Sequence, residues 1–179
     1  MRCGVVVKKS KIKTALKIII SIICGLLIGS YSAWCHYEKS SKPYTWGSND
    51  PIILNCIGPE LSEEKIRSSL EFWAEYGDTY AFIENNPSKS TCENDFLRGF
   101  IMLKEVPTDS LDGYAIAKTR SEVKFMRIVA ATIYFESGTW NLQWLTEHEL
   151  GHAFGYKHVP EKGNIMHPFL EFQKGKYWD

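Results

Sequence analysis

A histidine-rich stretch near the C-terminus has the residue types and spacing of a metal site. His148 and His152 are four residues apart, so on a helix their imidazoles lie on one face and can reach one ion. Glu149 is placed to hold a metal-bound water without being a ligand. Gly155 can adopt the left-handed conformation that ends a helix, and the turn would return His158 to the same ion. Three neutral nitrogen ligands and an open fourth position are typical of a catalytic zinc ion.

The charge of the chain is unevenly distributed. Six of the 21 basic residues, and none of the 21 acidic ones, lie in residues 1–37. Residues 38–179 therefore hold 15 basic and 21 acidic residues, a net charge of −6. An acidic domain is a poor partner for phosphate backbones, so we expect no nucleic-acid binding. These residues are numerous enough to bury the core of one domain.

The N-terminus has the pattern of a membrane-targeting segment. Residues 1–17 form a basic flank, and residues 18–34 form an apolar run that ends in small residues and has no polar face. Two interpretations stay open: cleavage of a signal peptide near Ser32, or a single-pass signal anchor, for which the run is only marginally long. The basic flank would stay in the cytosol. The rest would be exported, either tethered to the membrane by the uncleaved helix or secreted or periplasmic.

The remaining sequence predicts a linker and then one domain of strands and helices. Residues 35–50 are polar and predict the linker, and residues 51–179 predict the domain. Ser62 is a favourable N-cap, and Ile66, Leu70 and Trp73 then recur at helical spacing until Gly77. A second helix, over about residues 141–154, carries the histidines. Strands are expected over residues 51–57, 80–83, 100–103, 115–118 and 127–135.

Cys56 and Cys92 are the two cysteines of the predicted domain. In an exported protein they are candidates for a disulfide that closes a loop of moderate length. Such a bridge would stabilise the domain by roughly 2–4 kcal/mol. The alternative interpretation is a pair of buried free thiols.

The chain resembles the metzincins, a clan of zinc endopeptidases. Residues 148–158 match the signature HExxHxxGxxH at every defined position. Residues 164–168, Asn-Ile-Met-His-Pro, resemble the clan's Met-turn, whose methionine lies beneath the three histidines. The short distance from His158 to Met166 favours the matrixin branch. The residue two after Met166 is Pro168, so the extra tyrosine ligand of the astacin branch is missing.

The resemblance implies a zincin-like α+β fold: a twisted, mixed and mostly parallel sheet of five strands with two main helices, preceded here by the hydrophobic N-terminal helix. It implies one catalytic zinc ion held by His148, His152 and His158, with Glu149 as the general base. Met166 would be structural. No acidic cluster resembles the calcium loops of animal matrixins, so we expect no calcium site.

The segment after the Met-turn forms a wall of the S1′ pocket in the matrixin branch. Pro168, Phe169 and Leu170 would occupy that wall here. Only 13 residues follow Met166, so the third helix usual in the clan is expected to be short or absent.

The reaction implied by the resemblance is hydrolysis of peptide bonds by a zinc-activated water. Glu149 would accept the proton of that water. A protein or peptide substrate would lie extended along the edge strand, expected at residues 114–118. Two alternatives remain. One is a non-catalytic zinc-site interaction module, although such a module needs no Glu149. The other is a metallohydrolase of cell-wall peptides, which would use the same residues.

Overall fold

The structure is a computed structural model of the chain, and it describes residues 19–28, 41–47 and 49–177. The chain divides into two units, residues 1–40 and residues 41–179. In the first unit, residues 19–28 form a helix with exposed side chains. Among the described residues, no helix is both long and apolar enough to cross a membrane. Residues 1–18 and 29–34 of the expected leader lie outside the described residues, so its cleavage or retention stays a prediction.

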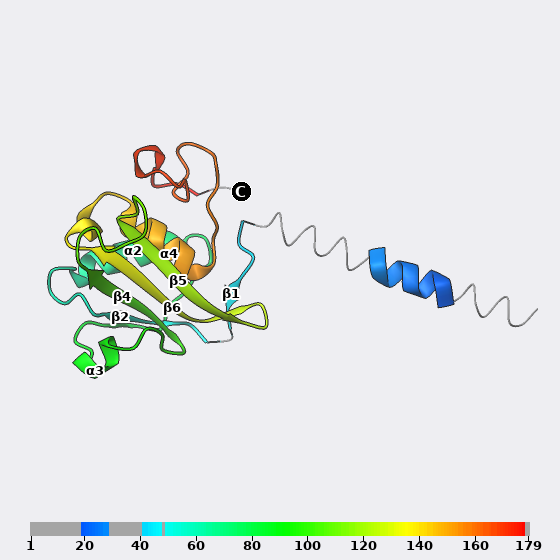
Figure 1. Cartoon of the computed structure of the whole chain (residues 1–179), viewed down its shortest axis with the longest axis horizontal. Helices are drawn as coiled ribbons and strands as arrows, with labels where there is room; N and C mark the ends of the chain where they lie inside the picture. The colour runs from blue at the N-terminus through cyan, green and yellow to red at the C-terminus, as the bar shows by residue number, and fades with distance from the viewer. Residues whose placement is uncertain (1–18, 29–40, 48, 178–179) are drawn as a thin grey trace, which may run out of the picture. The chain divides into compact units, whose positions relative to one another are not determined.

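The second unit is built on one mixed sheet (Figure 1). Its strands are β1 Thr45–Trp46, β2 Ile52–Asn55, β3 Ile83–Glu84, β4 Phe100–Val106, β5 Ala117–Lys124 and β6 Arg127–Glu136. Their order is β1-β6-β4-β2-β3, and β5 pairs with β6. All paired strands run parallel except β5, which is antiparallel to β6. The mostly parallel sheet that we predicted is therefore confirmed.

The sheet has six strands instead of the predicted five. The additional strand is β1, which pairs with the start of β6 through Thr45 opposite Arg127 and Trp46 opposite Ile128. It lies in the stretch that the sequence indicated as a linker. A strand of two residues has no alternating pattern, so only its pairing with β6 in the folded chain defines it.

Two helices pack on the same side of the sheet (Figure 1). In α2 (Glu63–Ala74), the Ser62 side chain accepts a hydrogen bond from the backbone N–H of Lys65 at 3.2 Å, as expected for an N-cap. The helix α4 (Leu145–Phe154) carries the first two histidines of the cluster. A short helix, α3 (Lys89–Cys92), and two 3-10 turns, η1 (Thr139–Asn141) and η2 (Leu170–Phe172), complete the fold. The core contains side chains from the sheet, α2 and α4: Ile53, Ile101, Ile133, Ile66, Leu70, Trp73, Leu150 and Phe154.

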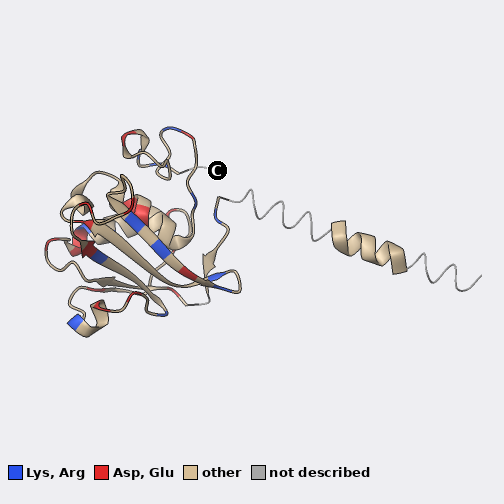
Figure 2. Ribbon diagram, viewed as in Figure 1, with Lys and Arg blue, Asp and Glu red and all other residues tan. Residues whose placement is uncertain are grey.

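The strand β5 runs further than the sequence indicated. We predicted a strand over residues 115–118, whereas β5 spans Ala117–Lys124. Charged residues lie along its length (Figure 2), so it lacks the apolar run by which strands are recognised. Within the described part of the chain, β5 pairs only with β6, which leaves its other edge open.

A disulfide joins Cys56, just after β2, to Cys92 at the end of α3, across a sequence separation of 36 residues. Replacing both cysteines by serine is expected to lower the free energy of unfolding by about 2–4 kcal/mol, because the unfolded chain regains the entropy of the open loop. Urea denaturation measures this change. Replacement of the exposed free cysteine Cys24 by serine is the control and should leave stability unchanged. Equal stability of the double variant and the parent would contradict the expected stabilisation by the disulfide.

Candidate metal centre

The three histidines of the cluster converge on one point. The Nε2 atoms of His148 and His152 are 3.1 Å apart, those of His152 and His158 are 3.0 Å apart, and those of His148 and His158 are 3.2 Å apart. Nitrogen ligands about 2.0–2.1 Å from a tetrahedral zinc ion are about 3.3 Å from one another. The triangle of Nε2 atoms therefore has nearly the size of one face of a zinc coordination tetrahedron, and the three residues form a possible metal site.

Hydrogen bonds to the other ring nitrogens orient two of these imidazoles. Nδ1 of His148 is 2.8 Å from the carbonyl oxygen of Ile165, and Nδ1 of His152 is 2.8 Å from that of Tyr156. A carbonyl can only accept, so each Nδ1 carries the proton and each Nε2 presents a lone pair. Two lone pairs at 3.1 Å repel unless a cation lies between them. The donor set therefore fits a metal ion bound through Nε2.

Burial keeps the cluster in the uncharged form that binds metal. Loss of hydration lowers the pKa of His148 to about 4 and the pKa of His152 to about 3. Burial also lowers the pKa of His158. The first two imidazoles are consequently neutral at pH 7, as a metal ligand must be.

The turn after α4 brings His158 to the other two histidines. Gly155 caps the helix at φ 104°, in the left-handed region, and its N–H donates to the carbonyl of His152 at 3.0 Å. A Cβ at residue 155 would lie 2.2 Å from the carbonyl oxygen of Tyr44. Glycine is thus required here both by the backbone angle and by a close contact.

The segment over residues 41–47 forms hydrogen bonds with residues on both sides of this turn. The carbonyl of Ser41 accepts a hydrogen bond from the N–H of Lys157 at 2.7 Å. The indole Nε1 of Trp46 donates to the carbonyl of Ala153, near the end of α4, at 2.9 Å. Residues that the sequence indicated as part of a linker therefore contact the chain directly around the metal centre.

Gly155→Ala is expected to lower the free energy of unfolding by more than the roughly 1–2 kcal/mol of a left-handed alanine, because its methyl group also collides with Tyr44. Gly77→Ala is the matched control. Gly77 has φ 89°, but a Cβ added to it would meet no atom within 4 Å. The alanine variant at residue 77 should therefore lose only the stability that a left-handed alanine backbone costs. Urea denaturation of both variants isolates the contact with Tyr44. Equal losses of stability would show that this contact contributes nothing.

Glu149 lies on α4 beside His148 and lines the same cleft. Its side chain is buried, and burial raises the pKa of Glu149 to about 7, against the opposing effect of a hydrogen bond with Thr119 of β5. The Thr119 Oγ1 is 2.5 Å from Oε2 of the carboxylate. A carboxyl group that titrates near neutral pH can both accept and release a proton there, as a general base that later acts as an acid must do.

Met166 is fully buried and packs against α4. A Cβ on Gly151 would lie 2.5 Å from the sulfur of Met166 and 2.4 Å from Cζ2 of Trp73. The α4 backbone at residue 151 can therefore approach Met166 and Trp73 closely only because glycine has no side chain. The side chain of Asn164 accepts a hydrogen bond from the N–H of Met166 at 2.9 Å and tightens the Met-turn. After it, the described tail contains the 3-10 turn η2 and no α-helix.

A cleft of about 640 Å³ surrounds the metal centre. The three histidines and Glu149 all line it. Residues 114–119 and 121 contribute from β5 and the chain before it. Pro168, Phe169 and Leu170 contribute from the segment after the Met-turn, together with Leu145 of α4. The residues expected to form a pocket wall thus lie in the same cleft as the histidines.

Two residues of this centre were not predicted from the sequence. Thr119 lies one residue beyond the predicted end of the edge strand, and only its pairing with β6 places it over Glu149. Gln173 lies in the irregular tail, where no periodicity marks it. Its buried amide Nε2 donates to the carbonyl of His167 at 2.9 Å and lies against the imidazole ring of His148. The tail therefore packs against the first histidine.

Comparison with known families agrees with this geometry. The Matrixin peptidase family matches residues 36–178, which is most of the chain and includes the histidine cluster, Glu149 and the Met-turn. A comparison with curated protein sequences gives no match. The family match covers most of the chain and includes the three converging histidines, and we conclude that the chain belongs to the matrixin family, within the metzincin clan of metallopeptidases.

Proposed function

We propose that this protein is a zinc-dependent endopeptidase. The observation that carries the proposal is the triangle of Nε2 atoms beside the buried carboxyl group of Glu149. A structural zinc site needs four protein ligands and no base, whereas the cluster offers three ligand atoms from the described residues, which would leave a fourth position for water. Membership of the matrixin family supports the same chemistry.

In this proposal His148, His152 and His158 hold the zinc ion. When bound, zinc supplies a Lewis acid and lowers the pKa of its water to about 7. Glu149 takes the proton from the attacking water and then delivers it to the leaving nitrogen, so one carboxyl group acts as base and as acid. Met166 supports the centre from below through its contact with α4.

The proposed substrate is a protein or peptide bound in an extended conformation. The open edge of β5 lines the cleft and offers backbone groups for strand addition. Pro168, Phe169 and Leu170, which line the same cleft, would form the wall of the S1′ pocket. Phe169 is 63% exposed, which leaves its ring available to an incoming side chain.

We also propose that the domain works outside the cytosol. The basic flank and apolar run of residues 1–34 support export, and the Cys56–Cys92 disulfide is typical of an oxidising compartment. In this arrangement residues 18–34 are the leader or anchor, and the peptidase domain follows it.

The experiment that tests this function compares substrate classes. The zinc-loaded protein is incubated with a library of linear peptides and with cross-linked cell-wall peptides, each with and without a chelator. We expect cleavage of the linear peptides that the chelator stops. Cleavage of cell-wall peptides alone would favour the alternative metallohydrolase, and a protein that binds zinc but cleaves neither would favour an interaction module.

A further inference from the structure

We propose that Thr119 is a positioning residue for Glu149, which fixes the general base to the strand along which the substrate binds. This inference rests on the proposed peptidase function and adds a residue outside the HExxHxxGxxH segment. Two contacts carry it: the Thr119 Oγ1 is 2.5 Å from Oε2 of Glu149 and 3.0 Å from the carbonyl oxygen of the same residue.

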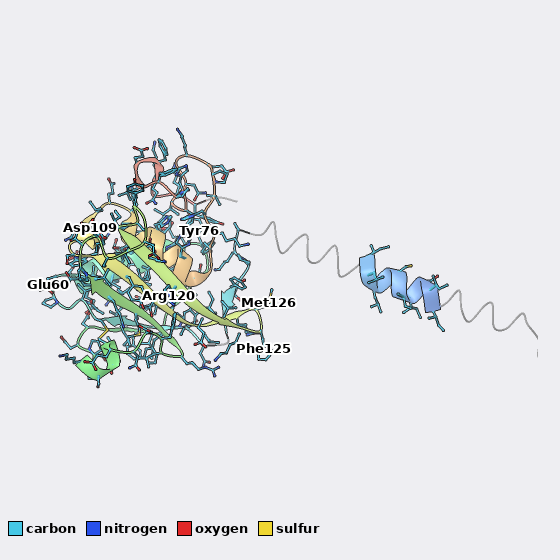
Figure 3. All side chains as sticks on the ribbon, viewed as in Figure 1. Glu60, Tyr76, Asp109, Arg120, Phe125 and Met126 are labelled. Atoms are coloured by element: carbon cyan, nitrogen blue, oxygen red, sulfur yellow. A yellow bond between two sulfur atoms is a disulfide. The ribbon has the colours of Figure 1, made fainter. Side chains whose placement is uncertain are left out.

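The position of Thr119 is set by the sheet. Thr119 pairs with Ile133 of β6, so its backbone is held in the ladder. Side chains alternate along a strand, and the next residue, Arg120 (labelled in Figure 3), lies with its guanidinium 5.7 Å from the ring of Phe96. Thr119 therefore faces α4. Its β-branched side chain has few rotamers, so the hydroxyl is presented to Glu149 with little freedom.

The hydroxyl satisfies Glu149 in both protonation states. When the carboxyl group is ionised, the hydroxyl donates to Oε2, and hydrogen bonds to charged acceptors are the stronger kind. When Oε2 is protonated, the hydroxyl can accept from it and donate to the carbonyl oxygen. The hydroxyl of Thr119 contacts Oε2 of the Glu149 carboxyl group and not Oε1. Thr119 thus occupies one oxygen of the carboxyl group and leaves the other for the attacking water.

The strand β5 would then determine both the register of the substrate and the orientation of Glu149. A substrate added to the open edge of β5 takes its register from the backbone of that strand, and Glu149 takes its orientation from a side chain of that strand. Loss of the hydroxyl should consequently impair proton transfer and leave the backbone contacts of the substrate in place. The effect is expected in kcat and not in KM.

The test uses two variants of the zinc-loaded full chain and a matched control. Thr119→Val keeps the shape and removes the hydroxyl, and it should lower kcat by about 10–100-fold with KM within about twofold. Thr119→Ser restores the hydroxyl and should return kcat to within about threefold of the parent. Thr79→Val is the control: Thr79 donates to the Asp50 carboxylate at 2.7 Å in an exposed pair away from the cleft, so this variant should match the parent.

A second readout does not depend on turnover. Crystal structures of the zinc-loaded parent and of Thr119→Val should show one orientation of the Glu149 carboxyl group in the parent and a displaced or divided one in the variant. An unchanged kcat in Thr119→Val, a serine variant as impaired as the valine one, or an unchanged Glu149 orientation would overturn the role of Thr119. A parent that cleaves no peptide would instead overturn the proposed function, while the comparison of structures would still decide the role of Thr119.

Discussion

Glu149→Ala is expected to lower kcat/KM for peptide cleavage by about 10²–10⁴-fold, the usual contribution of general acid–base catalysis. The same variant should still bind one zinc ion per chain, because the carboxyl group of Glu149 is not among the three converging ligand atoms. Steady-state kinetics and elemental analysis of the purified variant measure the two quantities. Retained zinc together with lost cleavage would show that Glu149 acts as a base, because loss of a ligand would also weaken zinc binding.

Glu149→Gln is the companion variant, since it keeps the side-chain volume and the acceptor for Thr119 but cannot take a proton. We expect it to be as inactive as the alanine variant. If the glutamine variant cleaves like the parent, Glu149 acts through packing or hydrogen bonding, and its assignment as the base is wrong.

His158→Ala is expected to weaken zinc binding by more than about 100-fold, because loss of a direct ligand should exceed the 10–100-fold effect of losing a partner of a ligand. His158 also lies outside α4, so its removal leaves the helix that carries the other two ligands unchanged. Competition with a coloured chelator measures the affinity, and peptide cleavage should fall in parallel.

His167→Asn is the control for the histidine variant. His167 lies close to the centre but outside the converging set, and its Nδ1 accepts a hydrogen bond from the N–H of Phe169 at 3.1 Å. This variant should bind zinc with nearly the parent affinity. Similar affinities for the His158 variant and the parent would contradict a three-histidine site.

The features predicted correctly from the sequence are those that local rules determine. The spacing of His148 and His152 is a property of any helix, and Gly155 ends that helix through its own backbone freedom. Ser62 caps α2 through a contact three residues away. The convergence of the three histidines follows from such short-range features, and for this reason a possible metal site could be predicted from eleven consecutive residues.

The features that were missed depend on contacts between distant segments. The hairpin between β5 and β6 turns at Phe125 and Met126 (Figure 3), both at positive φ, where turn rules anticipate asparagine or glycine. Without that signal the true length of β5, and hence Thr119, could not be recognised. Likewise, α4 starts only at Leu145 because Trp144 adopts a left-handed conformation that interrupts the predicted longer helix.

In the proposed function, the three histidines hold one zinc ion, and this ion makes the chain a peptidase. The most direct measurement is a titration of the zinc-free protein with zinc while peptide cleavage is followed. We predict that the rate rises in proportion to bound zinc and saturates at one ion per chain. Saturation of one site without cleavage, or cleavage that is equally fast before zinc is added, would contradict the claim.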